Sequence, residues 1–314
     1  MIYSARHVTT FGYNPAIRES VMEVRMQPRS EAQQRCLTFS LDVFPRANIM
    51  VYRDFSGNMV HHFDIPRRHA RARVTAQALV EVLPVPEPEL ASAGDWKDLD
   101  SMAVAGDFWE FLLPSYFARP TDLLHEFASE VKLERSPTPL EFVLNLSRTI
   151  YEKFDYAPNS TGVDSPIDHA LRSRAGVCQD FAHIMIALLR EYHIPARYVS
   201  GYLCHSRQIN DRSPESATHA WVEAFVPGPG WIGLDPTNHV LAGERHIRVA
   251  IGRDYSVVPP TRGVYKGEAD NELGVIVTVA PADAPPPEDL PPATITRSRA
   301  LRTDSEFQHD QQQQ

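Results

Sequence analysis

The sequence predicts an α+β protein in which an all-β, sandwich-like region precedes a core of helices packed on an antiparallel sheet. Three observations support this class. Short β-rich runs follow one another over about the first 85 residues, helical patterns lie between residues 138 and 192, and three strand-like runs come after them. Helices followed by a strand meander favour α+β over an alternating βαβ arrangement.

The β-rich region covers residues 1–85. Residues 36–44 alternate between apolar and polar side chains with the period of two that is typical of a half-buried strand, and residues 70–82 do the same. Residues 48–65 hold two β-rich runs around a Ser-Gly-Asn turn at 56–58, which predicts a hairpin. Several short strands in succession indicate an antiparallel sandwich or a small barrel.

Helical signals begin after a proline-rich stretch near residues 84–95, which we interpret as the start of a linker and helical segment at 86–135. Thr138, Pro139 and Glu141 are typical of a capped helix start, and apolar residues follow at a spacing of four. A shorter start lies at 165–168. From residue 281 the chain is rich in proline and ends in a glutamine tract, so 281–314 is predicted to be disordered.

Composition narrows the class of protein. The net charge of −9 argues against a general nucleic-acid binder, which needs a basic surface. Residues 1–75 nevertheless carry eleven Arg and six acidic residues, so this region is either an exposed strand face or a docking surface for an acidic partner. No apolar run is long enough to span a membrane and the first residues do not resemble a secretory signal, so we expect a cytoplasmic protein without membrane contact.

The three cysteines are too few for a disulfide framework and lack the CxxC spacing of a zinc site. We therefore expect reduced thiols, no metal and no cofactor. Cys204 beside His205 has no further ligand nearby, and no EF-hand-like loop predicts calcium binding.

Cys178 has the most informative surroundings of the three. Gly176 permits a close approach just before a predicted helix that runs from Cys178 to about Tyr192. A thiol in the first helical turn meets free backbone N–H groups and the positive end of the helix dipole, which favour the thiolate. From position alone, a buried cysteine that serves only as a small apolar residue is the alternative.

His219 and Asp235 are the predicted partners of this thiol, because a thiolate nucleophile needs a base and the base needs an orienting group. His219 opens one strand-like run, and Asp235 ends the next, with a Pro-Gly-Pro-Gly turn at 227–230 between them. A hairpin of these two strands would place both side chains at the same end.

The segments GVCQDFAHIMIALLREYHIPARYVSGYL and THAWVEAFVPGPGWIGLDPTN closely resemble the core of the transglutaminase-like superfamily, whose members are related to papain-like cysteine peptidases. The stretches TFGYNPAIRESVMEVRMQPRS and VYRDFSGNMVHHFDIP are similar to the β-rich region that precedes this core in bacterial transglutaminase-like proteins. The resemblance covers nearly the whole chain before residue 281 and implies a papain-like catalytic core at 136–280.

By that resemblance Cys178 is the nucleophile, His219 the general base and acid, and Asp235 the group that orients His219. The implied chemistry is acyl transfer at a peptide or protein amide through a thioester, with hydrolysis preferred and protein-glutamine transamidation as the alternative. A binding module on a degenerate core is the competing class. The backbone N–H of Cys178 is one expected oxyanion donor.

The second oxyanion donor is open at this stage. Related enzymes supply a Trp, Gln or Tyr side chain, and Tyr156 is our candidate, with a loop aromatic that only covers the core as the alternative. Gln179 and Asp180 either contact the reacting groups or cap the helix. Trp221 either walls a cleft, together with Trp231, or packs in the core. The polar segment 205–217 is either a cleft rim or a solvated loop.

Overall fold

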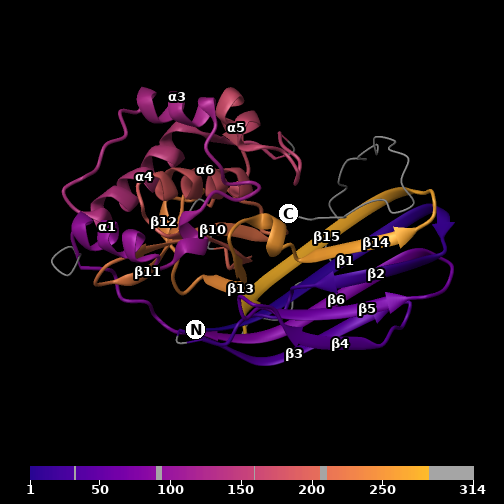
Figure 1. Ribbon diagram of the computed structural model, residues 1–314. Helices are drawn as coiled ribbons and strands as arrows, with labels where there is room; N and C mark the ends of the chain where they lie inside the picture. The colour runs from indigo at the N-terminus through magenta and orange to yellow at the C-terminus, as the bar shows by residue number, and fades with distance from the viewer. Residues whose placement is uncertain (32, 90–93, 159, 206–210, 283–314) are drawn as a thin grey trace.

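The computed structural model describes the chain except for residues 32, 90–93, 159, 206–210 and 283–314. Figure 1 shows two regions side by side: helices around a central sheet, and an elongated β sandwich made of long strands. The α+β class predicted from the sequence is confirmed.

The β sandwich consists of two four-stranded antiparallel sheets. The first sandwich sheet has the order β15-β1-β6-β3, and its strands are β1 (Ile2–Ile17), β3 (Gln34–Phe44), β6 (His69–Val82) and β15 (Asp270–Pro281). The second sandwich sheet has the order β14-β2-β5-β4, and its strands are β2 (Glu19–Val24), β4 (Ile49–Arg53), β5 (Met59–Ile65) and β14 (Thr261–Lys266). Alternate residues of both sheets form the apolar layer between them, including Phe11, Ile17, Val24, Phe63 and Val74.

The turn at 56–58 joins β4 and β5 as predicted, with Gly57 in the left-handed region at a φ of 77°. The predicted boundary of the catalytic core at residue 280 is wrong, because β14 and β15 return to the sandwich. β15 pairs with β1 from Tyr3↔Pro281 to Asn14↔Asp270, and β14 pairs with β2. The apolar alternation of β15 finds its partner more than 250 residues away in the chain, so no local pattern indicates it.

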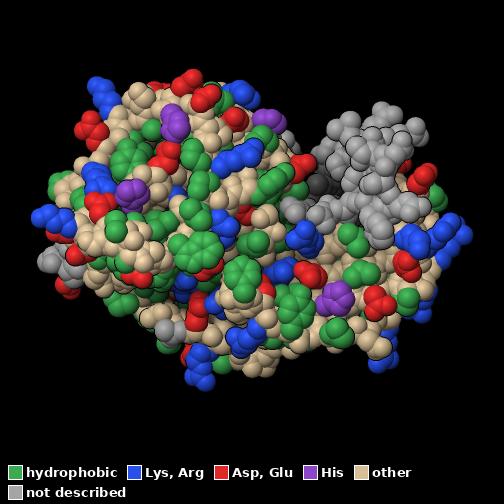
Figure 2. Space-filling view, viewed as in Figure 1, with side chains coloured by type: hydrophobic (Ala, Val, Ile, Leu, Met, Phe, Trp, Pro, Cys, Tyr) green, Lys and Arg blue, Asp and Glu red, His purple; other side chains and the backbone are tan. Residues whose placement is uncertain are grey.

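The arginines of the sandwich are partly paired within it. Arg25 contacts Glu23, Arg29 contacts Glu31, and Arg35 contacts Glu81. On the face seen in Figure 2, Lys and Arg side chains are dispersed among Asp and Glu over both regions.

The second region holds a five-stranded antiparallel sheet, the core sheet, with the order β12-β11-β10-β9-β13. Its strands are β9 (Ala196–Leu203), β10 (His219–Val226), β11 (Gly230–Asp235), β12 (Val240–Leu241) and β13 (His246–Gly252). A short parallel pair of β7 (Asp155–Tyr156) and β8 (Ala175–Gly176) lies apart from it, and a 3-10 turn, η2, spans Tyr255–Val257.

The helices of this region are α1 (Trp96–Ala105), α2 (Trp109–Leu112), α3 (Asp122–Glu130), α4 (Pro139–Lys153), α5 (Ile167–Ser173) and α6 (Cys178–Glu191). α4 begins as predicted, because Thr138 Oγ1 accepts a hydrogen bond from Glu141 N at 3.2 Å. α1 and α3 bury Leu99 and Phe127 in the same apolar cluster as α4 and α6, so the segment 86–135 also contributes to the core. No helix within the described ranges is long and apolar enough to cross a membrane.

α6 is the central helix of this cluster. It is buried from Cys178 to Arg190 and packs on β9 and β10, where Ala220, Val222 and Ala224 line the same cluster. A helix buried on all sides leaves its first residue little freedom. The packing of α6 on the core sheet therefore fixes the position of Cys178.

A second apolar cluster joins the core sheet to the sandwich. Tyr202, Cys204, Ile247 and Val249 of the core sheet pack against residues of the first sandwich sheet, including Tyr3, Ala5, Val80 and Val277. The side of the core sheet near β9 and β13 is therefore covered by the sandwich.

Candidate active site

Cys178 is the first residue of α6, as the sequence predicts. The preceding backbone is fixed by Asp180, whose Oδ2 accepts hydrogen bonds from Val177 N at 2.9 Å and from Thr161 Oγ1 at 2.6 Å. A Cβ at Gly176 would lie 2.9 Å from the same oxygen, so this close approach requires glycine. The thiol consequently meets the N-terminal end of a buried helix dipole.

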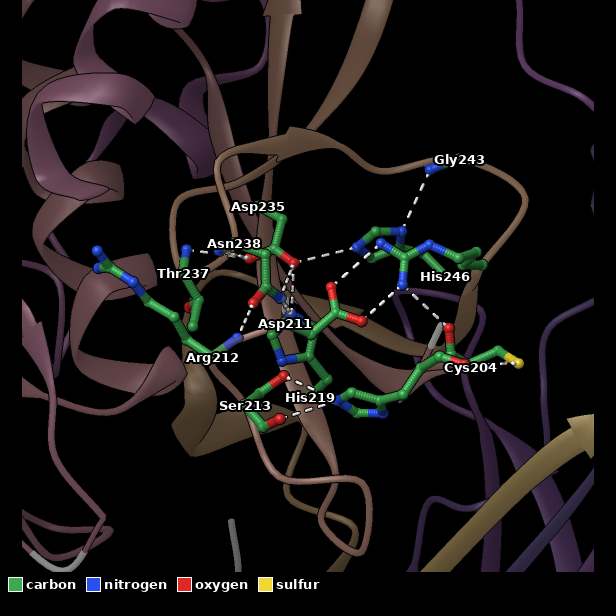
Figure 3. Close-up of polar contacts among 12 residues, drawn as sticks. Cys204, Asp211, Arg212, Ser213, His219, Asp235, Thr237, Asn238, Gly243 and His246 are labelled. Atoms are coloured by element: carbon green, nitrogen blue, oxygen red, sulfur yellow. Dashed lines mark hydrogen bonds and ion pairs between the residues drawn. The ribbon is translucent and has the colours of Figure 1, made fainter. Parts of the chain in front are cut away.

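The predicted β10–β11 hairpin is confirmed, with Val222 opposite Leu234 and Val226 opposite Gly230. It brings His219 and Asp235 together: His219 Nε2 donates to Asp235 Oδ2 at 2.7 Å (Figure 3). His219 is 2% exposed and Asp235 is fully buried. The sequence predicts that His219 and Asp235 lie at the same end of this hairpin, and in the structure they do.

Five N–H groups surround the Asp235 carboxylate. Oδ2 accepts from His219 Nε2, from Asn238 Nδ2 at 2.8 Å and from His246 Nε2 at 3.2 Å. Oδ1 accepts from Thr237 N at 3.0 Å and Asn238 N at 3.2 Å. A carboxylate with this many donors is held in one orientation and remains ionised.

The charges of the pair follow from these contacts. Burial by itself would lower the pKa of His219, but the Asp235 carboxylate and the nearby Cys178 raise it to about 10. Burial by itself would raise the pKa of Asp235, but His219 and His246 hold it well below its ordinary range. His219 is therefore protonated at neutral pH and places a positive charge beside Cys178.

The second ring nitrogen of His219, Nδ1, is buried and makes no hydrogen bond of normal length to another described residue. Cys178 is near enough to contribute to the raised pKa of the ring. Because Nε2 is committed to Asp235, Nδ1 is the nitrogen left for proton exchange with the thiol. A cysteine beside a histidine that is itself bonded to a buried carboxylate is the arrangement that can activate a thiol nucleophile.

Tyr156 lies beside this group on β7, opposite Gly176 of β8. Burial raises the pKa of its hydroxyl, and the neighbouring Cys178, Asp180 and Asp235 raise it further. The hydroxyl therefore keeps its proton at neutral pH and is a hydrogen-bond donor near the thiol.

The other cleft and oxyanion candidates are placed differently. Gln179 is fully buried and donates its amide to Val163 O at 2.9 Å, so it is not an open donor. Asp180 caps α6, and burial raises the pKa of its carboxyl while its bonds to Thr161 and Val177 lower it. Of the two alternatives for Trp221, the structure supports packing in the core: its side chain is fully buried, and its ring stacks on His219 at 6.1 Å between centroids.

Two further predictions concern the surroundings of the site. Trp231 packs against Phe108, Phe111 and Phe225 at the opposite end of the hairpin, so it is not part of the site either. The segment 205–217, for which a cleft rim and a solvated loop are the two alternatives, lies partly outside the described residues. In its described part, Arg212 N donates a hydrogen bond to Asn238 Oδ1 at 2.7 Å, and Asn238 in turn donates to Asp235. This part of the segment therefore helps to position a hydrogen-bond donor to Asp235.

His246 belongs to the site and was not identified from the sequence. It opens β13, 27 residues after His219, and sequence spacing gives no reason to place it at Asp235. One side-chain nitrogen or oxygen atom from each of His219, Asp235 and His246 lies within 4.8 Å of the other two, which is close enough for these residues to hold a metal ion. In this structure each of those atoms already takes part in an N–H···O hydrogen bond, which is the arrangement of an orienting carboxylate.

Comparisons with known proteins agree with this geometry. The chain matches the family model of the transglutaminase-like superfamily over residues 126–236 and that of the bacterial transglutaminase-like N-terminal region over residues 3–81. An uncharacterized protein of Mycobacterium leprae is 34% identical over 274 residues, which is 87% of this chain and 96% of that protein. The chain therefore belongs to the transglutaminase-like superfamily.

Two other proteins are similar over different extents. The crystal structure of a candidate cysteine protease from Cytophaga hutchinsonii superposes with a TM-score of 0.72 at 24% identity and covers 94% of each chain, which shows a shared fold. A protein-glutamine gamma-glutamyltransferase of Pseudomonas aeruginosa is 36% identical over 102 residues, which is 30% of this chain and 15% of that protein.

Proposed function

We propose that the protein is a thiol enzyme that cleaves amide bonds by acyl transfer through a thioester on Cys178, with water as the acceptor. The observation that carries the proposal is the constellation of Cys178 at the start of α6, His219 beside it, and Asp235 at 2.7 Å from His219. A binding module would not require a buried ion pair of this kind next to a helix-terminal thiol, since burying charges costs free energy.

The proposed reaction has two halves. The Cys178 thiolate attacks the amide carbonyl carbon, a C–S bond forms, and the carbonyl oxygen becomes an oxyanion. His219 then donates a proton to the amide nitrogen, the C–N bond breaks, and the amine leaves behind a thioester. In the second half, His219 takes a proton from the water that attacks the thioester, the C–S bond breaks, and the acid leaves with Cys178 as the thiolate beside protonated His219.

The oxyanion needs hydrogen-bond donors that are already in place. The backbone N–H of Cys178 is in the first turn of α6, where N–H groups have no partner within the helix. We assign the second donor to Tyr156, because its hydroxyl is protonated and lies near the thiol. Gln179 and Asp180, which are engaged elsewhere, do not fill this role.

Transamidation is the second candidate, and the similarity to the Pseudomonas aeruginosa glutamyltransferase favours it. The chemistry is the same up to the thioester, and an amine replaces water in the second half. Hydrolysis remains our first choice, because an amine must be bound in a site that excludes water in order to compete with it.

A product-mass experiment tests both reactions. The protein is incubated with a library of glutamine-containing peptides and a labelled primary amine, and the products are weighed. Hydrolysis predicts products with added water, transamidation predicts products with added amine, and a Cys178→Ala variant should give neither. No product of either kind, together with iodoacetamide alkylation of Cys178 no faster than of Cys36 and Cys204, would contradict the proposal.

A further inference from the structure

β13 forms one edge of the core sheet, with β9 as its neighbour on one side. An edge strand leaves backbone N–H and C=O groups without a partner strand. In this structure, two side-chain amides from the sandwich, together with the backbone N–H of Arg29, which donates to Arg248 O at 3.0 Å, take the place of that partner. Gln34 pairs with Arg248 and Asn58 pairs with Ile251, each through two hydrogen bonds.

These amides act as a neighbouring strand would. Gln34 donates to Arg248 O and accepts from Arg248 N, both at 2.8 Å. Asn58 donates to Ile251 O at 2.9 Å and accepts from Ile251 N at 2.8 Å. The two side chains are 0% and 1% exposed, so no water competes for the backbone groups they bind.

Both amides are themselves fixed within the sandwich. Gln34 Nε2 also donates to Arg29 O at 2.8 Å, and Asn58 Nδ2 also donates to Asp54 Oδ2 at 3.0 Å. Arg29 NH1 donates to Asn58 Oδ1 at 2.6 Å, which links the two. The sandwich therefore presents a preformed pair of amides to β13.

The first residue of β13 is His246, which contacts Asp235. Its Nδ1 accepts from Gly243 N at 3.3 Å, and its backbone N donates to Gly243 O at 2.9 Å (Figure 3). Burial lowers the pKa of His246 although Asp235 opposes this effect, so the ring is neutral. A neutral ring whose Nδ1 accepts must carry its proton on Nε2, and this proton is donated to Asp235.

We propose that the β sandwich is a positioning module for the catalytic group: it holds β13 through Gln34 and Asn58, and β13 in turn holds Asp235 through His246. His246 is then a positioning residue for the orienting carboxylate, and the sandwich has a part in catalysis as well as in the fold. This inference rests on the proposed function, because it matters only if Asp235 orients His219.

The experiment uses the full chain and the rate of alkylation of Cys178 by iodoacetamide at pH 6, resolved by peptide mass. His246→Phe keeps a ring against Trp221 but removes the donor, and it should slow the rate roughly tenfold. His246→Gln places an amide N–H near the position of Nε2 and should restore most of the rate. The low-field proton resonance of His219 Nε2–H should shift in the Phe variant and return in the Gln variant.

The sandwich arm uses Asn58→Leu, with Gln34→Met as a second probe and Gln77→Leu as the matched control, since Gln77 is an exposed residue of the same domain. Each probe should slow Cys178 alkylation about threefold or more, while the control keeps the wild-type rate. A His246→Phe rate equal to wild type, a Gln variant as slow as the Phe variant, or probes that match the control would overturn the inference. If Asp235→Asn itself leaves the rate unchanged, the proposed function fails instead.

Discussion

Asp235→Asn is expected to slow the alkylation of Cys178 at pH 6 by roughly fiftyfold or more. The pKa of His219 is about 10 against an ordinary value of 6.5, with Asp235 as the largest favourable cause. This difference corresponds to about 5 kcal/mol in favour of the imidazolium. Without the Asp235 charge, burial would lower the pKa of His219, the ring would lose its proton more readily, and Cys178 would lose its counter-ion.

The hydrogen bonds of Asp235 give a second reason to expect a slower rate in the Asp235→Asn variant. Among the residues that the structure describes, the groups hydrogen-bonded to the Asp235 carboxylate are all N–H donors, on Oδ1 and on Oδ2 alike. An asparagine amide must turn its own NH₂ group toward donors on one side or the other. It therefore either faces His219 with a donor, which favours the wrong tautomer, or gives up the two backbone bonds that hold the turn at 235–238.

The assay follows the rate for each cysteine by peptide mass spectrometry. Asp254→Asn is the matched control, because Asp254 is also a buried carboxylate that accepts backbone N–H groups, from Phe117 and Ser256, and its hydrogen bonds go to none of Cys178, His219 and Asp235. It should lose stability but keep the wild-type Cys178 rate. A wild-type rate in the Asp235 variant, or an equal loss in both variants, would refute the role assigned to the ion pair.

Three further predictions follow from the structure. Tyr156→Phe should lower amide turnover by about 10- to 100-fold while Cys178 alkylates at the wild-type rate, because the hydroxyl acts on the oxyanion only; a loss in both assays would contradict this. Burial lowers the pKa of His7 to about 3, so below pH 6.5 the unfolded chain takes up a proton that the folded chain does not. The free energy of unfolding should therefore fall by about 2 kcal/mol between pH 7 and pH 5. Denaturant titrations of a His7→Gln variant should lack this fall. Gly201→Ala would place a Cβ 2.1 Å from a backbone oxygen and should cost about 1 to 3 kcal/mol and lower the melting temperature, whereas Gly243→Ala, with its nearest atom at 3.9 Å, should have no such effect.

The His219–Asp235 ion pair also sets a pH dependence of turnover. The proposed acid step needs the imidazolium, which is lost as pH rises through about 10. Turnover should therefore decline above that pH, and Asp235→Asn should move the decline to lower pH. A pH–rate profile of amide cleavage checks this, and an unmoved high-pH limb would contradict the assignment.

Local sequence patterns determined the parts of the site that depend on neighbours along the chain. The start of α6 follows from a glycine, a thiol and a helical apolar stripe in succession, and the hairpin of β10 and β11 follows from two strand patterns around a Pro-Gly turn. Both features are short-range, so the placement of Cys178 at a helix start, and of His219 at the same end of the hairpin as Asp235, could be predicted.

Tertiary structure alone decided which distant segments complete the site. β14 and β15 join the sandwich through backbone pairing with strands more than 230 residues earlier, and backbone hydrogen bonds carry no sequence signal for their partner. His246 contacts Asp235 although β10 and β9 lie between β11 and β13 in the core sheet, so strand order gives no reason to expect this contact. In the sequence, Gln34 and Asn58 look like ordinary polar residues of a β domain. Their contacts with β13 exist only because the fold places this edge strand against them.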